Sequence, residues 1–264
     1  MVQGLLNKPI IGVIYLPPLL GHDGCPGMDS MISGTIQQVQ QLEKLGYTAA
    51  LLENENDRPY SLKARVEIVA SMTRITSDVV KACPKIKIGV EFLINDPMAS
   101  LAIAKASGAS FIRTDYFVDR MSREEFGGEI EINASEILAF RKKIGAVDID
   151  LYTDIQVKYA KLLTPGKTLA ESAGEARKFS SSAVVVSGRI TGEPIDVMEL
   201  KSLHESGTDI PIFLGSGLNS ENAVDLWPIC DGAMVGTSIM TQGIIDRAKA
   251  SVLIETICEI ENSR

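Results

Sequence analysis

The amino-acid sequence predicts an α/β fold, a (β/α)8 TIM barrel, in which eight parallel strands close into a barrel. Short apolar runs rich in β-branched residues alternate with longer helical patterns from one end of the chain to the other, as expected for a barrel built from βα units. The chain has 264 residues, close to the ~250 of one complete barrel. No long linker rich in glycine, serine or proline divides it, so we expect a single domain over residues 1–264.

The predicted strands are short, apolar and bounded by polar residues or glycine. They are Ile10–Tyr15, Ala49–Glu53, Lys87–Phe92, Phe111–Thr114, Ile149–Thr153, Ala183–Ser187, Ile210–Leu214 and Ala233–Val235. Pro17 and Pro18 interrupt the apolar stretch that contains the first run, which is also too short to cross a bilayer. We therefore expect a buried first strand and no transmembrane segment.

The stretches between these runs carry apolar residues at helical spacing together with good helix formers. Asp96 followed by Pro97 is typical of a helix start, and Gly46 is typical of a helix stop. The predicted helices are Ser33–Leu45, Ala64–Ala82, Pro97–Ser107, Ser135–Ile144, Leu169–Phe179, Val197–His204 and Ser220–Leu226.

An open, doubly wound sheet is the competing fold. A G-x-G-x-x-G turn after the first strand would favour that sheet. The segment from Leu16 to Gly21 instead reads LPPLLG, so the closed barrel is the preferred interpretation.

Composition limits the partners of this chain. Its net charge is −8 and its pI is about 5.0, which argues against nucleic acid or an anionic membrane as a binding surface. An anionic ligand would have to be held by local backbone donors.

The scattered cysteines contain no C-x-x-C pair and are typical of thiols in a reducing compartment, so we expect a cytoplasmic protein. Barrels often self-associate, and the sequence leaves a homo-oligomer open.

Glycine-bearing segments follow the last three predicted strands. Glycine allows close backbone approach and positive φ, so that successive N–H groups can converge on an anion, and the loops after strands 7 and 8 of a barrel often form a phosphate site. The segment after the sixth strand would face the same place, although alone it reads equally well as a flexible turn. The candidate phosphate-binding residues are Ser187, Gly188, Thr191, Gly192, Gly215, Ser216, Gly217, Gly236, Thr237 and Ser238.

Polar residues gather at the ends of the other strands, where barrels place their catalytic groups. Structural alternatives accompany several of them: Asp96 can cap a helix, Arg113 can neutralise nearby carboxylates, and Lys158 can be solvated, steer a phosphate or form a Schiff base. The candidate catalytic residues are Glu53, Asn95, Asp96, Arg113, Asp115, Asp154 and Lys158.

The two histidines, His22 and His204, do not support a histidine-based triad. His22 lies in a loop with Asp23 and Cys25, which is a weak metal signal beside the simpler interpretation as a surface loop. We assign no metal site. The cofactor is unknown and the sequence requires none, although a divalent metal stays open.

An ordered set of segments resembles the BtpA/SgcQ family of barrel proteins over almost the whole chain. The segments are 12–19, 53–54, 95–97, 108–113, 154–158, 187–192, 215–217 with Asn222, and 231–237. The resemblance implies a TIM barrel of the phosphate-binding type. It also implies either a role like that of the family's namesake, in accumulation of photosystem I, or one in sugar metabolism associated with phosphotransferase systems.

The chain departs from this family pattern near the expected site. Tyr15 stands where histidine is expected after the first strand, and Tyr159 stands where histidine is expected after Lys158. Asp115 replaces the usual asparagine. The loss of both histidines removes the groups best suited to proton transfer at neutral pH, although both tyrosines can hydrogen-bond a ligand.

Three functions fit these residues. The first is an enzyme of the isomerase, epimerase or aldolase (lyase) type acting on a small phosphorylated sugar, with carboxylates as acid and base and Arg113 or Lys158 stabilising a developing negative charge. The second is a non-catalytic assembly or stability factor that retains an anion-binding barrel. The third is a divalent-metal hydrolase built on Glu53, Asp115 and Asp154.

Overall fold

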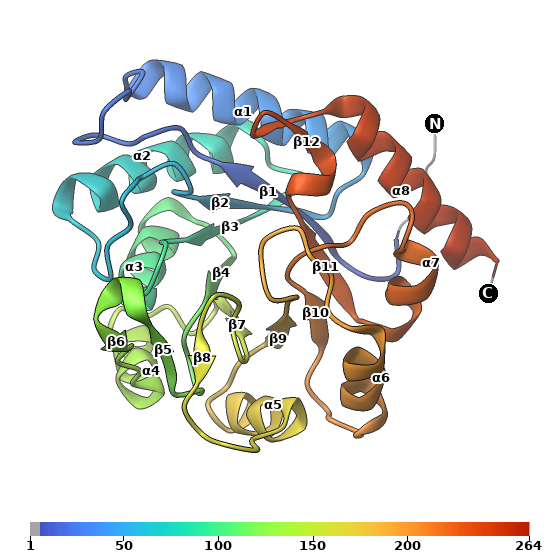
Figure 1. Ribbon diagram of the computed structural model, residues 1–264. Helices are drawn as coiled ribbons and strands as arrows, with labels where there is room; N and C mark the ends of the chain where they lie inside the picture. The colour runs from blue at the N-terminus through green and yellow to red at the C-terminus, as the bar shows by residue number, and fades with distance from the viewer. Residues whose placement is uncertain (1–5, 264) are drawn as a thin grey trace.

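The computed structural model describes residues 6–263 and confirms the predicted fold. Parallel strands close into a barrel in which the first strand pairs with the last, Ile10 lying opposite Ala233. Figure 1 shows the helices wrapped around the outside of this barrel. In barrel order the strands are β1 (Ile10–Tyr15), β2 (Ala49–Glu53), β3 (Lys87–Glu91), β4 (Phe111–Thr114), β7 (Asp150–Asp154), β9 (Ala183–Val186), β10 (Ile212–Leu214) and β11 (Gly232–Val235).

The outer helices form where the helical patterns predict them. Asp96 caps α3 by accepting a hydrogen bond from the backbone N–H of Ala99, and Thr168 caps α5 in a capping box with Glu171. The helix α8 is an addition to the predicted set. The helices are α1 (Met28–Leu45), α2 (Val66–Ala82), α3 (Pro97–Ser107), α4 (Ala134–Lys143), α5 (Leu169–Lys178), α6 (Val197–Glu205), α7 (Ala223–Leu226) and α8 (Arg247–Asn262).

Apolar side chains fill the amino-terminal half of the barrel interior. Phe111 on β4 stacks with Tyr152 on β7, which in turn stacks with Phe213 on β10, with ring centroids 4.9 and 5.1 Å apart. Gly89 gives Phe111 its room, since a Cβ atom there would lie 2.0 Å from the ring. This layer fills the barrel interior beneath the carboxyl ends of the strands, where barrels place their sites.

A small antiparallel sheet extends the wall of the barrel beside its mouth. It contains β5 (Met121–Arg123), β6 (Gly128–Glu129) and β8 (Lys161–Leu162), in the order β6-β5-β8, with the short 3₁₀ helix η1 (Glu124–Phe126) between the first two strands. The buried carboxylate of Asp119 fixes this region, since it accepts hydrogen bonds from the backbone N–H of Gln156 and from the Ser172 hydroxyl. The sheet was not predicted.

Short elements complete the carboxyl-terminal part of the chain. The 3₁₀ helices η2 (Trp227–Ile229) and η3 (Thr237–Ile239) precede and follow β11, and β12 (Met240–Thr241) pairs with β13 (Ile244–Ile245). Each of the four cysteines is a free thiol. Within residues 6–263, no helix has the length and apolarity that crossing a membrane would require.

Candidate functional site

A cavity of about 440 Å³ opens at the carboxyl ends of the barrel strands. We call this cavity the mouth. It gathers side chains from β1 to β4 and from the loops after β7, β9, β10 and β11, as the barrel prediction requires. The predicted site residues that line it are Glu53, Arg113, Asp115, Lys158, Thr191, Gly192, Gly215, Ser216, Gly217, Gly236, Thr237 and Ser238.

Other predicted site residues lie outside the mouth. The amide of Asn95 donates to the backbone carbonyl of Glu131 at 2.9 Å, and Asp96 caps α3 while also accepting from the N–H of Ala64 at 3.1 Å. Both side chains are therefore used by the fold, as the helix-cap alternative anticipated for Asp96. Asp154 lies beneath the cavity floor, and Ser187 and Gly188 line a neighbouring groove.

A row of polar side chains crosses neighbouring strands at the floor of the mouth. In the strand register Tyr15 lies opposite Glu53, and Glu53 lies opposite Glu91. Sequence analysis missed Glu91 because the predicted third strand continues through it to Phe92, so that it did not stand at a strand end. The available signal was a lone carboxylate inside the apolar run of β3, where an unpaired charge is costly.

One guanidinium serves the whole floor. Arg113 is 4% exposed and donates from Nε and Nη2 to the two carboxylate oxygens of Asp154, at 2.8 and 3.0 Å. Its contacts with the other two buried carboxyl groups are longer: Nη1 lies 3.5 Å from Glu53 Oε1 and Nε lies 3.7 Å from Glu91 Oε2. Asp154 therefore holds Arg113 in a bidentate pair.

Burial favours the protonated forms of the remaining carboxyl groups. It raises the pKa of Glu53, an effect opposed by the positive charge of Arg113. It raises the pKa of Glu91 well above its ordinary value, again opposed by Arg113. Burial, together with the negative charge of Asp154, raises the pKa of Asp115 to about 7. A carboxyl group with this pKa exchanges protons readily near neutral pH.

The loops after β10 and β11 present unused backbone donors to the mouth. Within residues 6–263, no protein acceptor takes the N–H groups of Ser216, Gly217, Gly236, Thr237 or Ser238. A Cβ atom at Gly236 would lie 3.0 Å from the Tyr15 hydroxyl. Glycine there keeps the β11 loop close to β1 and open to the cavity.

Two of the predicted phosphate-loop glycines serve the protein's own backbone. Cβ atoms at Gly188 and Gly217 would come within 2.4 and 2.2 Å of the backbone of the segment Glu193-Pro194. Gly217 also has a φ of 77°. These glycines let the β9 loop (residues 187–196) pack tightly against the β10 loop.

The two tyrosines that replace the expected histidines occupy different settings. The Tyr15 hydroxyl faces the β11 loop, and burial raises the pKa of this phenol. Tyr159 has a φ of 62° and accepts a hydrogen bond from the N–H of Thr191 at 2.7 Å. Tyr159 thus ties the loop after β7 to the β9 loop, and its hydroxyl is already engaged.

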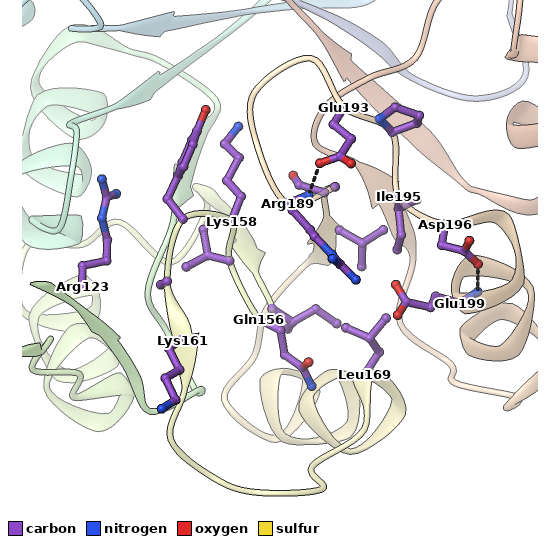
Figure 2. A pocket seen from close by; sticks show the side chains of 18 of the residues that line it. Arg123, Gln156, Lys158, Lys161, Leu169, Arg189, Glu193, Ile195, Asp196 and Glu199 are labelled. Carbon is purple, nitrogen blue, oxygen red and sulfur yellow. Dashed lines mark hydrogen bonds between the residues drawn. The ribbon is translucent and has the colours of Figure 1, made fainter.

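A larger groove of about 1480 Å³ adjoins the mouth, and the two share Arg123, Glu125, Lys158 and Tyr159. Figure 2 shows Arg123 and Lys161 on one side of this groove, with acidic residues on the other. Lys158 stands between the two cavities and forms no ion pair within the described residues. The acidic residues are Glu193, Asp196 and Glu199.

The structure does not support the weaker metal hypotheses. Across residues 6–263, no three side chains of His, Cys, Asp or Glu are grouped as metal ligands. Asp154, one of the three carboxylates of the predicted metal hydrolase, is held by Arg113. His22 lies 2.9 Å from an Arg65 nitrogen and 3.8 Å from Asp57, in a loop outside the mouth.

The fold and the site together define a (β/α)8 barrel whose mouth joins glycine-rich loops to a buried cluster of carboxyl groups. The sequence model of the BtpA family matches residues 6–259, and the chain belongs to this family. An uncharacterized protein of Archaeoglobus fulgidus is 32% identical, covering 94% of this chain and 98% of the relative. The photosystem I biogenesis protein BtpA of Synechocystis is 31% identical, covering 96% and 89%.

Solved structures with similar folds include enzymes whose names refer to phosphorylated compounds. Thiamine phosphate pyrophosphorylase from Pyrococcus furiosus aligns with a TM-score of 0.61 at 15% identity, covering 97% of this chain and 99% of that structure. A 3-hexulose-6-phosphate synthase aligns with a TM-score of 0.59 at 13% identity, covering 94% and 99%. At these identities the likeness shows the fold, and the chain is a BtpA-family barrel similar to phosphate-binding barrel enzymes.

Proposed function

We propose that this protein is an enzyme that isomerises, epimerises or cleaves a small phosphorylated sugar. The observation that carries the proposal is the meeting, in one cavity, of unused backbone N–H groups on the β10 and β11 loops with a carboxyl group whose pKa is about 7. The first feature suits a phosphate, and the second suits proton transfer.

The phosphate is placed against Ser216, Gly217, Gly236 and Thr237. Their free N–H groups provide donors without a fixed positive charge, which suits a chain whose net charge is −8. Thr191 and Gly192 of the β9 loop close over this end, since a Cβ at Gly192 would lie 3.3 Å from the Thr237 hydroxyl.

The other end of the ligand then meets Asp115 and Lys158. Asp115 acts as the proton-transferring group, and the Lys158 ammonium stabilises negative charge that develops on a substrate oxygen. The mouth is large enough for such a ligand, because small-molecule sites begin at about 300 Å³. The structural neighbours that act on phosphorylated substrates agree with this choice of ligand class.

Thermal unfolding in the presence of inorganic phosphate, sulfate and a panel of sugar phosphates tests the binding step. A ligand at one hundred times its Kd is expected to add about 2.7 kcal/mol of stability. Gly236→Asp places a carboxylate among the donors and is expected to abolish the shift. Gly174→Asp is the matched control, because a Cβ at Gly174 on α5 meets no atom within 4 Å.

Proton transfer is tested with the ligand that gives the shift. Incubation with the wild-type protein in D₂O is expected to replace a carbon-bound hydrogen beside the carbonyl, which proton NMR detects as a lost signal. A stabilising ligand with neither exchange nor cleavage would contradict the enzyme and favour a non-catalytic factor that retains an anion-binding barrel. The Synechocystis relative, a photosystem I biogenesis protein, is the reason to keep that second candidate.

A further inference from the structure

The buried carboxyl groups of Glu53 and Glu91 form a pair whose hydrogen bonding is incomplete among the described residues. They lie opposite one another on β2 and β3, with residue exposures of 6% and 1%. Glu53 Oε1 and both oxygens of Glu91 have no hydrogen-bond donor among the described residues. Buried carboxylate oxygens without donors are rare because they forfeit hydration without compensation.

The charges around this pair do not balance if every group is ionised. Arg113 already gives its two short hydrogen bonds to Asp154, and Lys158 is the other nearby cation. Two like charges held side by side in a buried site raise each other's cost of ionisation. A proton on either Glu53 or Glu91 removes one charge and supplies the missing donor. The charged or titratable groups facing the pair are Tyr15 from β1, Glu55 and Tyr60 after β2, Arg113 and Asp115 from β4 and its loop, and Asp154 and Lys158 from β7 and its loop.

We infer that Glu53 and Glu91 share one proton at neutral pH and form the acid side of the mouth, opposite the base Asp115. This inference rests on the proposed function and narrows its substrate to a phosphorylated hydroxycarbonyl compound, that is, an aldose or ketose phosphate. The carbonyl oxygen lies against the Glu53–Glu91 pair, and the hydrogen on the neighbouring carbon faces Asp115.

The chemical step balances without any further reactant. The Asp115 carboxylate takes the proton from the carbon beside the carbonyl, and the electron pair of that C–H bond forms a carbon–carbon double bond. The electrons of the C=O bond move to oxygen, which takes the shared proton and gives an enediol. Asp115 then gives its proton to the former carbonyl carbon, while the hydroxyl on the neighbouring carbon becomes the new carbonyl and gives its proton to the glutamate pair. This yields the isomer and restores both carboxyl sites. A general acid of this kind contributes ~10²–10⁴-fold to the rate.

The directions of the pKa shifts agree with this geometry. Burial raises the pKa of both glutamates, so the folded state keeps protons that the unfolded chain releases above its ordinary value of 4.5. The folded state therefore binds more protons, and stability falls as pH rises from that value toward the folded pKa. Removing the titrating group must reduce this loss.

The test compares Glu91→Gln and Glu53→Gln with wild type, since glutamine mimics a protonated glutamate. Infrared spectra of the wild type at pH 7 are expected to contain the carbonyl band of a protonated carboxyl group that shifts in D₂O and that is lost in Glu91→Gln. Unfolding at pH 5 and 8 is expected to show a smaller loss of stability with pH in Glu91→Gln. Absence of the band, together with an unchanged pH slope, would overturn the shared proton.

Deuterium exchange then separates this inference from the proposed function. Each glutamine variant is expected to lose at least ~100-fold in exchange rate on a substrate that the wild type processes. Exchange at the wild-type rate in both variants would overturn the acid role while leaving the enzyme intact. A protonated pair in a protein that neither exchanges nor cleaves any sugar phosphate would overturn both the acid role and the proposed function, and would leave only the shared proton.

Discussion

The same strands build both halves of the barrel interior, but the amino-terminal half is apolar and the carboxyl-terminal half is charged. On β2, Leu51 packs in the apolar half, whereas Glu53 lies two residues further on at the charged floor of the mouth. On β4, Phe111 and Arg113 repeat the arrangement. Because side chains alternate along a strand with a period of two, both members of each pair point into the barrel.

The difference shows which physical property limits substitution in each half: packing volume in the lower half and charge in the upper half. The lower half is neutral, so its tolerance depends on volume and does not change with pH. In the upper half several carboxyl groups surround the Arg113 guanidinium, which can offset only part of their charge. The tolerance of this half to substitution therefore depends on how many of those carboxyl groups are protonated. Substitutions in the two halves must therefore respond differently to the same change of pH.

The largest expected effect is the loss of the Arg113 guanidinium at the floor. Arg113→Met leaves Asp154 and its neighbours without a partner, which breaks a buried pair and costs about 3–5 kcal/mol at pH 8. The cost is expected to be smaller at pH 5, because protonation removes part of the uncompensated charge.

Urea unfolding at both pH values measures this difference. Arg113→Lys is the control, because it keeps the charge but loses the bidentate fork, and it should cost less than Arg113→Met at pH 8. An Arg113→Met penalty that is equal at pH 5 and 8 would contradict the division of the interior into a neutral and a charged half.

A smaller effect is expected from overfilling the lower half. Gly89→Ala places a methyl group 2.0 Å from the Phe111 ring, and such overpacking typically costs about 1–3 kcal/mol. The same unfolding measurement should return equal penalties at pH 5 and 8. Adding Phe111→Leu should recover part of the loss, and a pH-dependent penalty would show that the two halves are coupled.

The smallest expected effect separates a helix cap from a catalytic group. Asp96→Ala removes the cap of α3 and should cost about 1 kcal/mol, without changing ligand-induced stabilisation or deuterium exchange. Asp246→Ala, which removes the cap of α8, is the matched control. A loss of exchange in Asp96→Ala alone would return Asp96 to the catalytic residues.

The barrel could be predicted from the sequence because polar residues and glycines mark the ends of its strands. Pro97–Ser107 and Phe111–Thr114 coincide with the predicted ranges, whereas α1 starts at Met28, ahead of the predicted Ser33. The sheet β5-β6-β8 could not be predicted from local patterns, because its strands are two or three residues long and pair only through tertiary contacts.

Most candidate site residues stood at or beside the predicted strand ends, and Glu91 was passed over because the third strand was expected to continue to Phe92. Glu53 and Arg113 stood where barrels place chemistry, but Glu91 required the register of β3 against β2. The roles of Gly188 and Gly217 likewise depend on where Pro194 lies, which no local pattern encodes. The sequence therefore predicted many of the residues that line the mouth but not the carboxyl pair on β2 and β3.

The pairing of β1 with β11 also determines when the barrel can close during synthesis of the chain. Ile10 can pair with Ala233, and so close the barrel, only after more than about 200 further residues have been synthesised. The row of Tyr15, Glu53 and Glu91 lies on β1 to β3, which are made consecutively, whereas the glycine loops that would hold a phosphate are made with the last two strands. Non-local closure of this kind is slow relative to local pairing. A nascent chain thus contains Glu53 and Glu91 long before the loops that would bind a phosphate, so binding of the proposed ligand would report that β1 has paired with β11.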